Sequence, residues 1–306
     1  MDRQAVQADS SGLSRGLDLD VIVNFAPTGM LPTKEMTPHV PVCVSEIVED
    51  VHRAVEIGIT SVHIHARDEL TGRPTLDAEI YARIVSGIRG FTQDLVIGLS
   101  LSSRASAELS RRLAPLDLDG GLKPDMGSLT LSSLNFNKQA SVNSPETIQT
   151  LAARMLEKGI VPELEAFDSG MINYAKYLTR KGVLQGPHYF NLLLGNIACA
   201  QADMLHVGVM VNDLPEDSYW SLAGIGDRQL SMNAVGVAFG GGVRVGLEDN
   251  IWYDPARTRL ATNAELLSRV HELIAANERR VMTSSRLREL LNLQVGSGEY
   301  GRPSPG

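Results

Sequence analysis

Two histidines in the segment VHIH (residues 62–65) have the spacing that most directly suggests chemistry. Side chains two apart in a β-strand point to the same face, so His63 and His65 lie about 7 Å apart and can converge on one metal ion. The same pair could also be one core histidine and one loop histidine. Metal binding is favoured because the polar run ARDE (residues 66–69) follows directly, at the end of the predicted strand.

The stretch GGVRVGLEDN (residues 241–250) places charges at the end of another apolar run. Alternation puts Arg244 and Glu248 on one face, where burial is costly unless the charges are paired, metal-bound or in a wet site. Glu248 is therefore predicted to join His63 and His65 as a third ligand. Two histidines, one carboxylate and an open position are typical of catalytic zinc, although Fe(II) or Mn(II) also fit. An Arg244–Glu248 ion pair with a purely structural role is the alternative.

A third polar group lies on three further strand-like runs. Glu163 and Glu165 in the segment PELE share one face, and Glu165, nearer the strand end, is predicted to face substrate. Ser100 and Ser128 end two other runs and offer hydroxyl donors at the same level. Alone, each serine would be an unremarkable small residue.

Positioning these residues requires a fold in which strand ends meet. Short apolar runs alternate with amphipathic segments, and eight of them are strand-like: Val21–Phe25, Ser61–His65, Leu95–Leu99, Met126–Leu131, Val161–Phe167, Tyr189–Leu194, Trp220–Gly224 and Val243–Leu247. This alternation predicts an α/β protein with a (β/α)8 TIM barrel, whose chemistry sits at the carboxyl ends of the strands. A doubly wound open sheet is the alternative, but no glycine-rich dinucleotide or phosphate loop follows the first strand.

Helix boundaries between these runs can also be predicted. Isoleucines at 80, 84 and 88 follow Asp77 at helical spacing. Ser144-Pro145-Glu146 supplies a cap residue, a first-turn proline and a first-turn acid, and Gly159 is placed to end that helix.

Composition limits the class of protein. The 306 residues are 43% hydrophobic and 21% charged, as in a globular enzyme, and 28 basic against 36 acidic residues give a net charge of −8. That charge argues against nucleic-acid binding, and two cysteines cannot form a disulfide framework. Without an apolar run of about 20 residues or a signal-peptide core, the chain is expected to be cytoplasmic and to have no membrane partner. Composition predicts a flexible arm over residues 1–18, one catalytic domain over 19–294 and a flexible tail over 295–306.

Five motifs in order resemble one family, the β-keto acid cleavage enzymes, whose founding member is the 3-keto-5-aminohexanoate cleavage enzyme: VHIHARDELTGRPT, PDMGSLTLSSLNF, VPELEAFDSGM, AGIG and GGVRVGLEDN. The resemblance spans roughly residues 20–290. It implies a zinc-dependent (β/α)8 barrel, commonly a homotetramer. The implied reaction combines a β-keto acid with acetyl-CoA to give acetoacetate and a new acyl-CoA.

The resemblance also implies roles for individual residues. His63, His65 and Glu248 match the zinc ligands, and Asp249 matches the base that starts the reaction, with Arg244 orienting it. Glu165 matches a residue at the substrate. The predicted substrate-binding residues are Ser100, Ser128, Ser103, Thr130 and Met30.

Two departures from the founding member concern the substrate. Met30 and Leu31 stand where that enzyme has a glutamate that recognises the substrate ammonium, so a neutral or apolar substrate tail is expected. Ser102 and Ser103, followed by Arg104, replace a Gly-Gly pair and could polarise the carboxylate end.

Two other classes remain open. A metal-dependent hydrolase on the same fold also uses His-x-His, but usually on the first strand and with further histidines at later strand ends. A binding protein with a structural zinc would need four protein ligands, and the sequence offers three.

Overall fold

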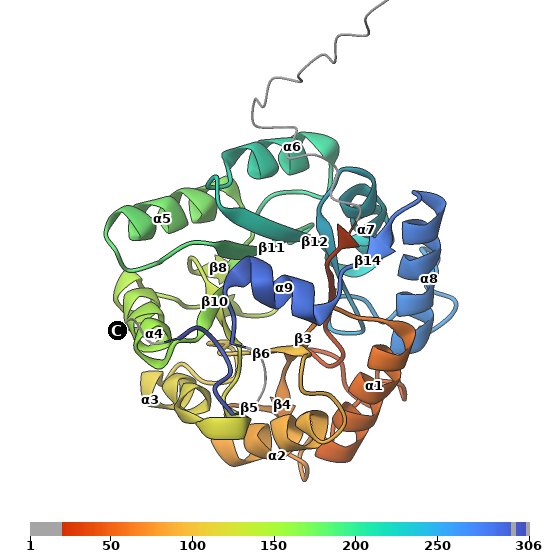
Figure 1. Cartoon of the computed structure of the whole chain (residues 1–306). Helices are drawn as coiled ribbons and strands as arrows, with labels where there is room; N and C mark the ends of the chain where they lie inside the picture. The colour runs from red at the N-terminus through yellow and green to blue at the C-terminus, as the bar shows by residue number, and fades with distance from the viewer. Residues whose placement is uncertain (1–19, 295–297, 304–306) are drawn as a thin grey trace, which may run out of the picture.

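Eight parallel strands close into a barrel in the computed structural model, which describes residues 20–294 and 298–303 (Figure 1). Around the barrel, β10 is followed by β11, β12, β13, β2, β3, β6 and β7, which pairs with β10 again. In chain order these strands are β2 (Val23–Phe25), β3 (Ser61–Ile64), β6 (Val96–Leu99), β7 (Met126–Thr130), β10 (Val161–Ala166), β11 (His188–Leu194), β12 (Ser218–Gly224) and β13 (Gly242–Val245).

A helix follows every barrel strand and the helices form an outer ring, which confirms the predicted (β/α)8 barrel over an open sheet (Figure 1). Asp77 and Ser144 accept backbone hydrogen bonds at the starts of their helices, as predicted, because a side-chain oxygen satisfies N–H groups left free in a first turn. The helices are α1 (Val44–Ile57), α2 (Ala78–Arg89), α3 (Leu109–Leu113), α4 (Pro145–Lys158), α5 (Ser169–Arg180), α6 (Met204–Asp213), α7 (Gln229–Ala238), α8 (Asn263–Ala276) and α9 (Ser284–Leu291).

Short elements complete the chain. Two hairpins pair β4 (Ala66–Arg67) with β5 (Pro74–Thr75) and β8 (Leu134–Asn135) with β9 (Ala140–Ser141). Single 3₁₀ turns span Ala114–Asp117, Gly120–Leu122 and Gly226–Arg228. Within residues 20–294 and 298–303, every helix is too short or too polar to cross a membrane.

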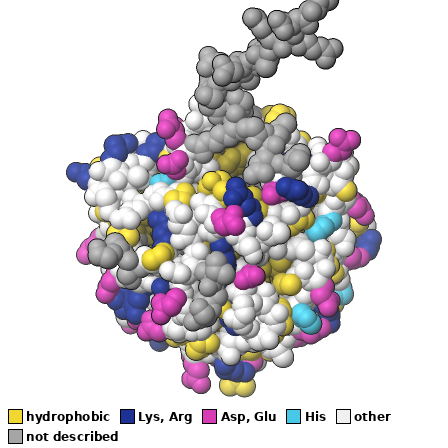
Figure 2. Space-filling view, in the orientation of Figure 1, with side chains coloured by type: hydrophobic (Ala, Val, Ile, Leu, Met, Phe, Trp, Pro, Cys, Tyr) yellow, Lys and Arg dark blue, Asp and Glu magenta, His cyan; other side chains and the backbone are white. Residues whose placement is uncertain are grey.

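The amino end of the barrel is closed by α9, which lies across it (Figure 1). Leu287 and Leu291 of this helix pack with residues from the strand starts, including Val96, Met126 and Tyr189, in one buried cluster. Lys, Arg, Asp and Glu side chains are interspersed over the visible described surface of this face (Figure 2). Because α9 and these apolar side chains fill the amino end of the barrel, a site can form among the polar interior residues at the carboxyl end of the strands.

The bounds of most barrel strands differ from the predicted runs by one or two residues, and the first and last barrel strands show why. Val21 belongs to β1 (Asp20–Val21), which pairs outside the barrel with β14 (Arg280–Val281). The last barrel strand stops at Val245 because the chain turns at Gly246, whose φ is 150°. A Cβ on Gly246 would lie 2.0 Å from the carbonyl oxygen of Ala26, so only glycine allows this close approach.

Part of the predicted C-terminal tail is packed, so the prediction of a loose tail is wrong for residues 298–303. Tyr300 is buried, with the guanidinium of Arg89 stacked 3.6 Å from its ring centroid. Asp125 accepts the backbone N–H of Gly301 and pairs with Arg288 at 2.7 Å, so a buried charge cluster anchors this segment. The predicted arm (residues 1–18) and the remainder of the tail lie outside the described residues.

Candidate active site

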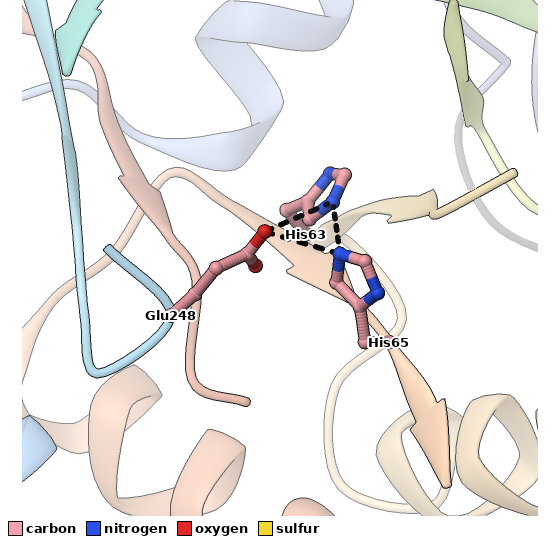
Figure 3. A group of neighbouring side chains, drawn as sticks. All are labelled: His63, His65 and Glu248. Atoms are coloured by element: carbon pink, nitrogen blue, oxygen red, sulfur yellow. Dashed lines mark hydrogen bonds and ion pairs between the residues drawn. The ribbon is translucent and has the colours of Figure 1, made fainter. Parts of the chain in front are cut away.

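Three metal-ligand side chains converge at the carboxyl end of the barrel (Figure 3). His63 lies in β3 and His65 directly follows it, and their Nε2 atoms are 3.2 Å apart. Glu248, from the turn after β13, places Oε1 3.1 Å from Nε2 of His65 and 4.0 Å from Nε2 of His63. The structure therefore brings together the three residues that the sequence predicts as ligands.

This arrangement fits a divalent cation. Two nitrogen ligands on a tetrahedral zinc ion are about 3.3 Å apart, close to the 3.2 Å between the two Nε2 atoms. The second oxygen of Glu248, Oε2, is buried and has no hydrogen-bond partner in the described residues, which is costly for a carboxylate without a cation. Three ligands would leave an open position, as catalytic zinc sites do.

Glu163 holds His63 from behind. Its Oε2 lies 2.6 Å from Nδ1 of His63, and its Oε1 accepts from the side-chain amides of Asn24 and Asn191. Burial disfavours the charge on Glu163, but the His63 imidazole outweighs it and lowers the pKa of Glu163 to about 2. An ionised Glu163 keeps the His63 proton on Nδ1 and leaves the Nε2 lone pair for a metal, the carboxylate–histidine–metal arrangement of many zinc sites.

Glu163→Gln is expected to weaken metal binding by about 10- to 100-fold without unfolding the protein. The amide keeps the shape but removes the negative charge that orients His63. Competition with a chromophoric chelator measures the affinity, and Glu157→Gln on the exposed face of α4 serves as the matched control. Equal affinities for Glu163→Gln and the unmodified chain would mean that Glu163 has only a packing role.

Arg244 joins the cluster of His63, His65 and Glu248 to Asp249. Its Nη2 lies 2.6 Å from Oε1 of Glu248 and its Nε donates to Oδ2 of Asp249 at 2.9 Å. Burial raises the pKa of Asp249, although the charge of Arg244 acts in the opposite direction. Burial also acts to raise the pKa of Glu248, but Arg244 and the two histidines outweigh it and hold that pKa well below its usual range. The two neighbouring carboxylates therefore differ: Glu248 is the stronger acid, suited to a ligand, and Asp249 is the more basic.

The position of Glu248 comes from a turn and a neighbouring loop. After Gly246, the backbone N–H groups of Asp249 and Asn250 both bond to the Gly246 carbonyl. A Cβ on Gly29, whose φ is 65°, would lie 2.4 Å from Cγ of Glu248, so glycine is needed at that position. The Gly29 carbonyl is held in turn by Nε and Nη2 of Arg67, at 3.0 and 2.7 Å.

A cavity of about 110 Å³, open to solvent at its mouth, lies over these residues. Glu165 lines it, with one carboxylate oxygen accepting from Thr130 Oγ1 at 2.6 Å, and burial raises the pKa of Glu165. The walls comprise Met30, Leu31, His65, Ser100, Ser102, Arg104, Thr130, Phe136, Ser141, Glu165, Phe167, Leu193, Ile225, Arg244, Glu248 and Asp249.

Two predicted substrate-binding serines do not line this cavity. Ser128 is buried and its Oγ accepts the backbone N–H of Leu101 at 2.9 Å, so it braces the loop after β6. Ser103 bonds to Ser141 Oγ at 2.9 Å, and its neighbour Ser102 takes the position on the cavity wall.

Sequence reasoning missed several functional neighbours. Glu163 was grouped with Glu165 by alternation, and nothing local showed that it would contact His63. The polar interior partners Asn24 and Asn191 lie in apolar runs that read as ordinary strands. Phe136 comes from the β8–β9 hairpin, which was not predicted.

Comparisons with known proteins agree with this geometry. The family profile described as beta-keto acid cleavage enzyme matches residues 20–293. A 3-keto-5-aminohexanoate cleavage enzyme of Fusobacterium nucleatum is 33% identical over 276 residues, covering 90% of this chain and 98% of that protein. A 3-oxoadipate:acetyl-CoA acetyltransferase of Cupriavidus necator is 35% identical over 278 residues, and the match covers 89% of this chain and 94% of that protein.

Among solved structures, the apo structure of ObcA has the same barrel. The TM-score is 0.75 at 21% identity, and the match covers 85% of this chain and 66% of the ObcA chain. At that identity the likeness concerns the fold alone. The profile match over nearly all of the described barrel, with two relatives above 30% identity, shows that the chain belongs to the β-keto acid cleavage enzyme family.

Proposed function

We propose that this protein is a zinc-dependent β-keto acid cleavage enzyme. In the proposed reaction a β-keto acid, R–CO–CH₂–COO⁻, and acetyl-CoA give R–CO–S-CoA and acetoacetate, with no oxidation or reduction. The observation that carries the proposal is one cavity that joins the ligand cluster of His63, His65 and Glu248 to the Arg244–Asp249 pair. Acetyl-CoA as the second substrate is supported by the name of the Cupriavidus necator relative.

Asp249 is the proposed base. Its carboxylate takes a proton from C2 of the keto acid, and the resulting carbanion forms a bond to the acetyl carbon of acetyl-CoA, releasing CoA thiolate. The thiolate then attacks the original ketone carbon, the bond between C2 and C3 breaks, and Asp249 returns the proton to the departing acetoacetate. Arg244 keeps the Asp249 carboxylate oriented throughout, through the bond from its Nε.

Zinc held by His63, His65 and Glu248 would act as a Lewis acid that polarises the ketone and acidifies C2. Glu165, half-buried in the cavity wall and bonded to Thr130, is placed to contact the substrate. Burial raises the pKa of Glu165, which makes its carboxyl a weaker acid than that of a solvated glutamate.

A coupled assay tests this function directly. Purified protein is incubated with β-keto acids with and without acetyl-CoA, and acetoacetate and the new acyl-CoA are measured together by mass spectrometry. The proposal requires both products in equal amounts and only when acetyl-CoA is present. Consumption of a substrate by water alone would support the metal-dependent hydrolase instead.

The substrate tail is not expected to carry an ammonium. Met30 lines the cavity and offers no charge, and Glu35, the nearest acid in sequence, is exposed and absent from the wall. We expect 3-oxohexanoate to be turned over with at least about tenfold higher kcat/KM than 3-keto-5-aminohexanoate, because an unpaired buried ammonium is costly. Met30→Glu should reverse part of this preference, and better turnover of the amino acid by the unmodified chain would contradict the interpretation.

The homotetramer implied by the family resemblance also remains a proposal. The helix α6 exposes Met204, Leu205 and Val209, which are 53%, 75% and 50% accessible in the single chain. Such an apolar row is typical of a surface that a second copy covers. Light scattering of the purified protein tests the oligomeric state.

A further inference from the structure

Arg104 is a cation on the wall of the cavity. It lies in the loop after β6, and its guanidinium carbon is 4.0 Å from the ring centroid of Phe136 in the β8–β9 hairpin. Stacking fixes the plane of the guanidinium, while its N–H edges remain available for an acceptor in that plane. Both residues line the same cavity as His65, Glu248 and Asp249.

The guanidinium of Arg104 has no hydrogen-bond or ion-pair partner among residues 20–294 and 298–303. Its contact with a neighbouring side chain is the stacking on the Phe136 ring. By contrast, every buried arginine in the described part of the chain donates to at least one oxygen atom. Arg112, for example, bonds to the Leu101 carbonyl and Asn143, and Arg288 bonds to Asp125. Arg67, Arg89 and Arg244 also donate to oxygen atoms, although Nε of Arg89 and Nη1 of Arg244 have no partner among the described residues. Arg104 is half-buried, and its guanidinium N–H groups face the open cavity with no protein acceptor, so a carboxylate of a bound ligand can take that place.

The second arginine on the wall is already engaged. Arg244 bonds to Glu248 and Asp249, so it serves the reacting end of the cavity. Burial lowers the pKa of Arg104, whereas the charges of Glu248, Glu165 and Asp249 raise it, and the guanidinium stays charged. Among the described residues that line the cavity, Arg104 is thus the arginine without a carboxylate partner.

We propose that Arg104 binds a second carboxylate at the far end of the substrate, so that the preferred substrates are β-keto dicarboxylic acids. The inference deepens the proposed function and rests on it. The reacting keto and carboxylate groups belong with the ligand cluster, and an Arg–carboxylate pair against the Phe136 ring would hold the other end. The apolar tail expected from Met30 and Leu31 is thereby revised: these residues exclude an ammonium, and Arg104 supplies the partner of an acid.

Two six-carbon substrates isolate this interaction. 3-Oxoadipate and 3-oxohexanoate have the same keto acid end and differ in the terminal carboxylate. We expect the unmodified enzyme to favour 3-oxoadipate by at least about 100-fold in kcat/KM, and Arg104→Met to reduce this preference to within about tenfold, because charged hydrogen bonds of this kind contribute about that factor. Arg104→Glu reverses the charge at this position, so the ratio of kcat/KM values should shift further, away from 3-oxoadipate and towards 3-keto-5-aminohexanoate, whose tail carries an ammonium.

Controls separate this role from others. Arg111→Met on α3 removes one exposed positive charge close in sequence and should keep the preference for 3-oxoadipate. Equal losses with both six-carbon substrates in Arg104→Met would overturn the proposal, since they indicate a structural role or binding of the shared carboxylate. A rise in KM for acetyl-CoA alone would assign Arg104 to a CoA phosphate and also overturn it.

The proposed function and this inference fail in different ways. If no keto acid yields acetoacetate, the proposed function is wrong. If the enzyme forms acetoacetate from 3-oxohexanoate and from 3-oxoadipate with equal kcat/KM, the function stands and the inference about Arg104 is wrong. Thermal unfolding and metal content of each variant, compared with the unmodified chain, show whether a loss of turnover comes from unfolding.

Discussion

Asp249→Asn is expected to lower turnover by about 10²- to 10⁴-fold, the contribution typical of a positioned general base. Asparagine has nearly the same shape, but its amide cannot take a proton from the substrate. Arg244 holds Oδ2 of Asp249 at 2.9 Å, so the side chain is fixed before substrate arrives and the loss should appear mainly in kcat. Glu248 is unchanged in this variant, and metal binding should persist.

Steady-state kinetics with acetoacetate detection measures this effect. Metal content and thermal unfolding are measured on the same samples, and Asp119→Asn, an exposed acid paired with Lys158, is the matched control. A direct test of the proton step is exchange of the C2 hydrogens of the keto acid in D₂O without acetyl-CoA, which should also slow. Near-normal turnover and exchange in a metal-replete Asp249→Asn variant would move the base role to Glu165.

Loss of the metal is expected to abolish turnover, and His65→Ala to lower metal occupancy from one ion per chain to a small fraction at equal free zinc. His65 supplies one of the three proposed ligand atoms. Its Nε2 lies within 3.2 Å of the other two, Nε2 of His63 and Oε1 of Glu248. Removing a ligand should cost more than the roughly 10- to 100-fold that loss of a supporting residue costs.

Elemental analysis after dialysis against defined zinc concentrations gives the occupancy without relying on activity. His206→Ala, which removes an exposed histidine paired with Asp203 on α6, is the matched control. Chelator-treated enzyme should regain turnover on addition of zinc. Full occupancy in His65→Ala would remove His65 from the site, and turnover by metal-free enzyme would remove Lewis-acid chemistry from the mechanism.

Much of the scaffold could be predicted from local patterns. Strand alternation and helix spacing indicated the (β/α)8 barrel, and the caps at Asp77 and Ser144 were correct because a cap depends on hydrogen bonds within one turn. His63 and His65 could be paired from sequence since two residues of one strand share a face whatever surrounds them. The motifs carrying the family resemblance also lie within single strands and the loops that follow them.

The tertiary structure decided everything that depends on contacts between distant strands. Glu163 and Glu165 are equivalent by alternation, yet Glu163 contacts His63 and Glu165 lines the cavity, because the stagger between strands sets the depth of each side chain. For the same reason the Oγ of Ser128 accepts the backbone N–H of Leu101 and does not line the cavity.

Loop residues were the least predictable. Glu248 reaches the two histidines through a turn that begins where Gly246 meets the backbone at Ala26, 220 residues earlier in the chain. Arg104 gained its place by stacking on Phe136 of another loop, and Tyr300 was buried between Arg89 and Arg288. By itself the sequence determined the barrel and the chemistry of its residues. The distances between those residues, and so the partners left for a substrate, depended on packing that no local pattern encodes.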